Sequence, residues 1–221
     1  MPAINAIKKY KINSYYHLYN RAHSKNTIFN NAEDYIFFVS ILKKYLTPKV
    51  KVKINNEFFE IDNPKSMHRN IDLIAFCIMP NHFHLLVKQK NEKDISKFVK
   101  RISISYCLYY RKKYKHSGYL FQGRFKGVLL RTEKAISKTF DYVHKNPLKA
   151  KLAKKEENYR WSSSRHYAGK QRFSFIKSEG RTLLGATFQV PSRLVLDSNY
   201  PKIKVNIARD RIRKTYSKAS I

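Results

Sequence analysis

The segment IDLIAFCIMPNHFHLLV restricts the fold more strongly than any other part of this chain. Two extended apolar runs, residues 71–78 and 82–88, flank the tripeptide MPN, which predicts a turn because proline presets one turn dihedral and asparagine tolerates another. Residues i and i+2 of a strand lie on the same side, about 6.6 Å apart. His82 and His84 should therefore project together, while Phe83 points to the opposite face and fills a core.

The H-x-H pattern is also a candidate metal site. Two neutral imidazoles at this separation can ligate one divalent ion. The alternative interpretation is a pair of histidines on a half-exposed strand with no ligand. A metal site further needs a third ligand and a chemical role, and neither is supplied by the strand that carries His82 and His84.

The helix expected at residues 133–145 offers both. Tyr142 borders its apolar stripe, and Asn146 follows one turn later, about 40° away around the helix axis. The amide oxygen of Asn146 is a hard ligand that suits Mg²⁺ or Mn²⁺. A tyrosine hydroxyl can act as a covalent nucleophile near a metal that polarises a phosphodiester. Ordinary amphipathic packing is the alternative explanation for Tyr142.

The spacing of apolar residues along the chain predicts an α+β fold of the ferredoxin-like kind, an antiparallel sheet with helices packed on it. Strands are expected at residues 14–22, 50–61 (a hairpin around Asn55-Asn56), 71–78, 82–88 and 124–131, and helices at 32–46, 94–114 and 133–145. Pro147 should end the last helix. Asn146 should lie at its frayed end, because the residue before proline is biased away from helical geometry.

Charge is the strongest global signal. Lys and Arg number 46 against 15 acidic residues, a net charge of +31. Such a field would destabilise a compact fold unless a polyanion offsets it, so nucleic acid is the expected partner. The lysine-rich composition of an AT-rich genome is the alternative explanation. No apolar run reaches the length of about 18 residues that a membrane span needs. Only Cys77 and Cys107 are present, which favours a reducing, cytoplasmic setting.

Basic and aromatic residues alternate along the helix expected at 94–114. That mixture predicts a surface that tracks a nucleic-acid backbone and stacks bases, with the candidate contacts Lys100, Arg101 and Arg111. An amphipathic helix with snorkelling lysines is the alternative. The basic stretch at 202–218 is expected to be a nucleic-acid arm or a disordered solvated end.

Three segments together resemble a known family: FCIMPNHFHLLV, YLFQGRFKGVLL and FDYVHKNPLKAKLAKKEENYRWSSSRHY. They resemble the REP-associated tyrosine transposases, single-tyrosine transposases of the His-hydrophobe-His (HUH) endonuclease superfamily. The resemblance runs in order from about residue 14 to 168. It implies a ferredoxin-like sheet with the histidine pair on a central strand. It also implies metal-dependent cleavage of single-stranded DNA, which gives a 5′-phosphotyrosine and a free 3′-OH, followed by strand transfer.

By position, the resemblance makes His82 and His84 the metal pair and Tyr142 the nucleophile. Asn146 resembles a third ligand, where related transposases often have glutamine. His144 departs from the family pattern and is expected to face solvent or phosphate. Further family positions near the bound DNA and at the close of the domain are Gln122, Gly123, Arg124, Phe125, Trp161, Ser162 and Ser163.

Residues 1–168 are therefore expected to form an HUH transposase domain, and residues 169–221 a basic extension that is partly disordered. The expected enzyme uses Mg²⁺ or Mn²⁺ to cleave and join hairpin-forming single-stranded DNA, as a monomer or a homodimer. One alternative is a domesticated, non-cleaving nucleic-acid-binding protein on the same fold. Another is a metal hydrolase with an activated water. That class needs more His or Asp ligands, and no ligand spacing is evident among His17, His23, His68, His116 and His166.

Overall fold

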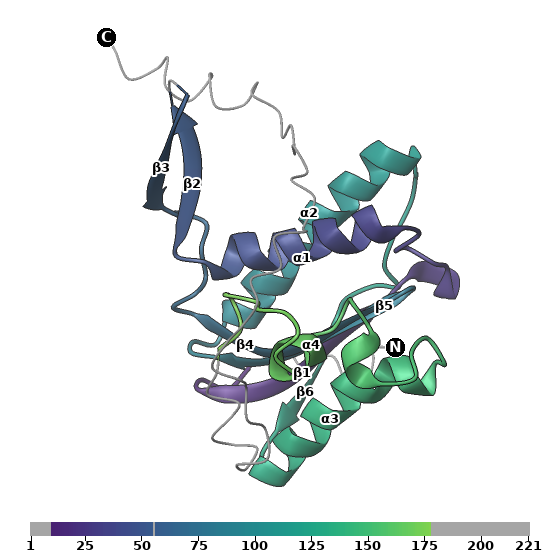
Figure 1. The fold of residues 1–221 in the computed structure, drawn as a ribbon. Helices are drawn as coiled ribbons and strands as arrows, with labels where there is room; N and C mark the ends of the chain where they lie inside the picture. Colours follow the sequence, from purple (N-terminus) through teal and green to yellow (C-terminus); the bar gives the residue numbers. More distant parts are fainter. Residues whose placement is uncertain (1–9, 55, 178–221) are drawn as a thin grey trace.

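Residues 10–54 and 56–177 are described by the structure, a computed structural model, and they form a mixed α+β fold. The central sheet has four antiparallel strands in the order β4-β5-β1-β6: β1 (Ser14–Arg21), β4 (Ile71–Met79), β5 (His82–Gln89) and β6 (Lys126–Leu130). Helices α1 (Ala32–Leu46) and α2 (Asp94–Tyr114) cover one face, and α3 (Glu133–Lys149) covers the other (Figure 1). This strand order and the crossover helices α1 and α2 are ferredoxin-like, so the predicted fold class is confirmed.

The strands β2 (Lys49–Ile54) and β3 (Glu57–Asp62) form a separate hairpin that projects away from the central sheet (Figure 1). Asn56 at its turn has a φ of 69°, a left-handed conformation that asparagine tolerates better than most residues. The hairpin expected around Asn55-Asn56 is therefore present.

The main core lies between the sheet and helices α1 and α2. Phe83 is fully buried there, with its ring centroid 5.2 Å from that of Phe38 on α1. Tyr106 on α2 packs edge-on against Phe38 at 5.3 Å. Strand alternation then directs His82 and His84 to the opposite face of β5, as the sequence predicts. Since β5 lies between β4 and β1, the histidine pair is on a central strand.

Helix α3 begins where expected and ends later than expected. The hydroxyl of Thr132 caps it by accepting a hydrogen bond of 3.1 Å from the amide of Ala135. The helix continues through Pro147 to Lys149, so the prediction that Pro147 ends it was wrong. Proline in the last turn removes only one helical hydrogen bond, and this proline is buried. Asn146 consequently lies within regular helix, and its carbonyl accepts from the amide of Ala150 at 3.0 Å.

The outer edge of β4 is covered by residues that follow α3. The amide of Ile78 donates to the carbonyl of Trp161 at 2.9 Å, and the amide of Ser163 donates to the carbonyl of Phe76 at 2.9 Å. Farther along the same edge, the amide of Lys177 donates to the carbonyl of Leu73 at 3.0 Å. A paired edge of this kind cannot recruit a strand from another molecule. Within the described ranges, no helix has the length and hydropathy needed to cross a membrane.

Candidate metal and nucleophile site

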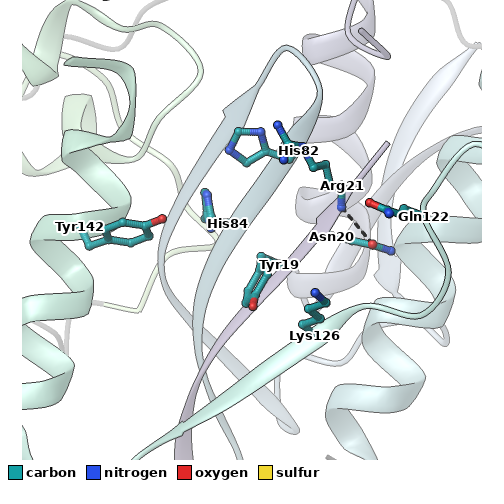
Figure 2. A pocket seen from close by; sticks show the side chains of 8 residues that line it. All are labelled: Tyr19, Asn20, Arg21, His82, His84, Gln122, Lys126 and Tyr142. Carbon is teal, nitrogen blue, oxygen red and sulfur yellow. Dashed lines mark hydrogen bonds between the residues drawn. The ribbon is translucent and has the colours of Figure 1, made fainter. Parts of the chain in front are cut away.

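A cavity of about 600 Å³ opens on the face of the sheet that α3 covers. Residues from three strands, α3 and the loop before β6 surround it (Figure 2). They are Tyr19, Asn20, Arg21, His82, His84, Gln122, Lys126 and Tyr142. The structure thus brings together both histidines, the candidate nucleophile and Gln122, residues that are far apart in the sequence.

Each histidine of the pair has its Nδ1 atom engaged by a neighbouring side chain. The rings of His82 and His84 lie 4.9 Å apart between centroids and are nearly perpendicular. Nδ1 of His82 is 2.6 Å from Oδ1 of Asn81, and Nδ1 of His84 is 2.9 Å from Nε2 of His17. Nε2 of His84 is buried and has no hydrogen-bond partner among the described residues. A buried nitrogen of this kind fits a metal ligand.

Burial keeps both imidazoles neutral. Desolvation lowers the pKa of His82 to about 4, and the charge of Arg21 acts in the same direction. Desolvation also lowers the pKa of His84 well below its ordinary value, with His17 and His82 adding to the effect. Neutral imidazole is the form that ligates a metal ion, so the pair is ready to bind one at physiological pH.

Tyr142 reaches the site from α3. Its side chain is 40% exposed, and its ring lies edge-on to that of His84 with 5.5 Å between the centroids. Figure 2 shows its hydroxyl directed toward the strand that carries the histidines. Nζ of Lys149 lies 4.9 Å from the centre of the same ring, close enough for a cation–π contact. Helix α3 therefore does cross the histidine face, which the sequence alone leaves untested.

Asn146 is 9% exposed and lies one turn after Tyr142 on α3. Its Nδ2 atom donates a hydrogen bond of 2.6 Å to the carbonyl of Tyr142, which leaves Oδ1 as the other polar atom of the side chain. Asn146 is not among the residues that line the cavity, so its place beside the two histidines stays a prediction. Two neutral imidazole nitrogens and one amide oxygen are ligand types that can hold a divalent ion. The unpartnered Nε2 of His84 supports this fit.

The residues predicted to contact DNA fall into two groups. Gln122 lines the cavity, and its backbone amide donates to the carbonyl of Arg21 at 2.8 Å. Arg124 is exposed in the same loop before β6. Phe125 is half-buried and stacks on Tyr10, with 6.3 Å between the ring centroids.

The second group lies on α2, on the other side of the sheet from the cavity. Lys100 is exposed there. The guanidinium of Arg101 donates to the carbonyl of Lys65 at 2.9 Å, and that of Arg111 donates to the carbonyl of Gly118 at 3.0 Å. The structure does not bring these residues to the histidine pair. Their role in binding DNA stays a prediction, and it would concern a part of the DNA away from the cavity.

His144 differs from the expectation that it faces solvent or phosphate. It is 2% exposed, and its Nε2 lies 2.7 Å from Oγ of Ser163. Burial lowers its pKa to about 3, so it is a neutral core residue. Ser163 also accepts a hydrogen bond of 2.8 Å from the amide of Phe76, so the Ser163 side chain connects α3 to the edge of β4. The expectation failed because the sequence contains no sign that residues 161–163 fold back beside α3.

Some residues at the site carry only a weak sequence signal. His17 and Tyr19 alternate on β1, and the strand register pairs Tyr19 with His84, so both face the cavity side of the sheet. Lys126 is the register partner of Tyr19 on β6 and extends the same face. The alternation HLY at residues 17–19 shows that His17 and Tyr19 share a face of their strand. It would indicate that they face the site only if the pairing of β1 with β5 were already known.

Comparison with known proteins assigns the chain to a family and gives a solved structure with the same fold. Residues 10–146 match the model of the family described as transposase IS200 like. A Haemophilus influenzae protein, whose name assigns it to the REP-associated tyrosine transposases, is 28% identical over 143 residues, covering 58% of this chain and 77% of that protein. The solved structure of a REP-associated tyrosine transposase bound to a REP hairpin shares the fold, with a TM-score of 0.53 and 13% identity over 77% of this chain and 95% of that one. The chain belongs to the family of IS200-like transposases.

Proposed function

We propose that this protein is a metal-dependent transposase that cleaves single-stranded, hairpin-forming DNA through a covalent bond to Tyr142. The observation that carries the proposal is the approach of Tyr142 to His84 across the cavity, with 5.5 Å between their rings. Neither residue alone would indicate a cleavage site, since a tyrosine on a helix and a histidine on a strand are common packing residues. Their approach supports a site in which Tyr142 would be a nucleophile beside the metal ligand His84.

His82, His84 and Asn146 would hold Mg²⁺ or Mn²⁺ through their Nε2, Nε2 and Oδ1 atoms. The bound ion would withdraw charge from the scissile phosphate and make phosphorus more electrophilic. The Tyr142 hydroxyl then loses its proton and attacks phosphorus. A bond forms between its oxygen and phosphorus, the bond from phosphorus to O3′ breaks, and O3′ takes up a proton. The products are a 5′-phosphotyrosine and a free 3′-OH, which can attack the phosphotyrosine of another strand during transfer.

The DNA strand would lie along the exposed side of the cavity. Arg21 and Lys126 are exposed at its border and can neutralise backbone phosphates. Tyr19 between them offers a ring on which a base can stack. A hairpin is the proposed substrate because the solved relative with the same fold is bound to a REP hairpin.

The test is covalent capture. A hairpin oligonucleotide with single-stranded flanks, labelled on the 3′ side of the cut, is incubated with the protein and Mn²⁺ and separated on a denaturing gel. The wild-type protein should form an adduct, and Tyr142→Phe should form none while binding the DNA with unchanged affinity. Tyr19→Phe is the matched control, because Tyr19 lines the same cavity and should not be the nucleophile. An adduct that survives Tyr142→Phe contradicts the assignment.

The same gel separates the alternative functions. A non-cleaving DNA-binding protein would retard the oligonucleotide in a native gel and leave it intact in a denaturing one. A metal hydrolase with an activated water would release a free 5′-phosphate with no protein attached. That hydrolase class needs further His or Asp ligands, and the described residues hold no group of at least three His, Cys, Asp or Glu side chains that could hold a metal.

A further inference from the structure

His17 is the side chain that contacts both halves of the proposed active site. It projects from β1 on the cavity side of the sheet, and its ring stacks on that of His84 with 5.1 Å between the centroids. It also lies edge-on to Tyr142 at 5.7 Å. His17 thus touches a candidate metal ligand on β5 and the candidate nucleophile on α3.

The 2.9 Å contact between Nε2 of His17 and Nδ1 of His84 contains one hydrogen, and its position decides what His84 can do. If His84 donates, its Nε2 keeps a free lone pair. If His17 donates, a neutral His84 carries its hydrogen on Nε2. That atom is buried without a partner among the described residues, and a buried N–H with no acceptor is rare. The first arrangement is therefore favoured.

His82 provides an independent precedent within the same site. Asn81 donates from Nδ2 to the carbonyl of Lys25 at 3.0 Å, which turns its Oδ1 toward Nδ1 of His82 at 2.6 Å. A carboxamide oxygen only accepts hydrogen bonds, so His82 must carry its hydrogen on Nδ1. Both histidines of the pair would then present a bare Nε2, each fixed by a different neighbour.

We propose that His17 is a positioning residue that accepts a hydrogen bond from Nδ1 of His84 and so keeps Nε2 of His84 free to bind the metal. Partners of this kind orient metal-bound histidines and set their tautomer. The edge contact with Tyr142 places His17 beside the candidate nucleophile as well. The metal-binding part rests on the proposed function, whereas the tautomer of His84 is a property of the metal-free protein.

The first test is nuclear magnetic resonance of metal-free protein labelled with ¹⁵N in histidine, in which long-range correlations report which ring nitrogen carries hydrogen. His82 and His84 should both carry it on Nδ1. His17→Gln should preserve this state because its carboxamide oxygen can accept from His84. His17→Leu should shift hydrogen onto Nε2 of His84. Hydrogen on Nε2 of His84 in the wild-type protein would overturn the proposal whether or not the protein cleaves DNA.

The second test is binding of Mn²⁺ alone, measured by electron paramagnetic resonance without DNA. His17→Leu should bind Mn²⁺ about 10- to 100-fold more weakly than wild type, and His17→Gln should recover most of that loss. His23→Leu is the matched control, because His23 is exposed just beyond β1 and lines a different cavity from the pair. Unchanged Mn²⁺ affinity in His17→Leu overturns the role of His17. A different outcome would separate the two proposals. If the predicted tautomer and the predicted effects on Mn²⁺ binding are found but the wild-type protein forms no DNA adduct, the role of His17 is supported and the proposed function is contradicted.

Discussion

The side-chain amide of Asn146 donates a 2.6 Å hydrogen bond to the carbonyl of Tyr142, so one turn of α3 joins the candidate third ligand to the candidate nucleophile. Because this bond uses Nδ2, the oxygen Oδ1 is the end of the carboxamide that could bind a metal ion. The helix continues past Asn146 to Lys149, which holds both side chains on a regular backbone. Ligand and nucleophile should therefore move together whenever α3 shifts on the sheet.

The first prediction concerns this pair. Asn146→Ala should raise the Mn²⁺ concentration needed for half-maximal adduct formation by at least about tenfold, the size of effect that loss of even an outer partner of a metal site causes. Asn146→Asp keeps an oxygen ligand and should retain adduct formation. Lys145→Ala, at an exposed neighbouring position, serves as the control. An unchanged Mn²⁺ requirement in Asn146→Ala would exclude Asn146 as a ligand.

The second prediction concerns the charges at the cavity border. Replacing Arg21 or Lys126 with glutamine would remove one of the proposed phosphate contacts. Each change should weaken single-strand binding and reduce the slope of log affinity against log salt by about 0.7. Lys43→Gln on α1, on the far side of the sheet, should leave the slope unchanged. Measuring Lys100→Gln in the same series tests the expected DNA-binding role of α2, which a reduced slope would support.

The third prediction concerns a buried carboxylate that joins α1 to α2. Asp34 has no exposed side-chain surface and accepts hydrogen bonds from Lys113 at 2.8 Å, Tyr109 at 2.9 Å and Tyr114 at 2.7 Å. Burial alone would raise the pKa of Asp34. The hydrogen bonds, above all from Lys113, outweigh burial and hold the pKa below its ordinary value of 3.8.

Asp34→Asn should therefore lower the free energy of unfolding at pH 7 by roughly 2–3 kcal/mol, as expected for loss of a buried charged partner. Because the pKa of Asp34 is lower in the folded state, its stabilisation is complete above pH 3.8 and is lost as the pH falls through the folded value. The difference in the free energy of unfolding between wild type and Asp34→Asn, measured by urea unfolding, should therefore disappear over that acid range. Glu33→Gln is the control, since Glu33 also binds Lys113 but is 68% exposed. A gap that persists at low pH would contradict this account.

Strand alternation was enough to predict one half of the site. The order of polar and apolar residues in HFH places Phe83 in the core and His82 and His84 on the other face, because successive side chains of a strand must point in opposite directions. The position of Tyr142 beside the apolar stripe of α3 was predictable for the same kind of reason. Local periodicity fixes which way a side chain points from its own element.

The remaining features depend on contacts between distant segments, which local patterns do not contain. His17 joins the site only because β1 pairs with β5, and His144 is buried only because Ser163 returns to it across 19 positions. Pro147 stays helical because tertiary packing buries it, which outweighs its local cost. Each of these outcomes was decided by packing and not by local preference.

The hydrogen bonds that close the edge of β4 also bear on how a smaller version of this enzyme could be produced. The family match stops at residue 146, and a fragment cut there would still contain every side chain proposed to react. It would lack the bonds that Trp161, Ser163 and Lys177 make to β4. An open strand edge next to a hydrophobic core invites aggregation during expression. A minimal version of this transposase should therefore extend at least to Lys177 if it is to stay soluble.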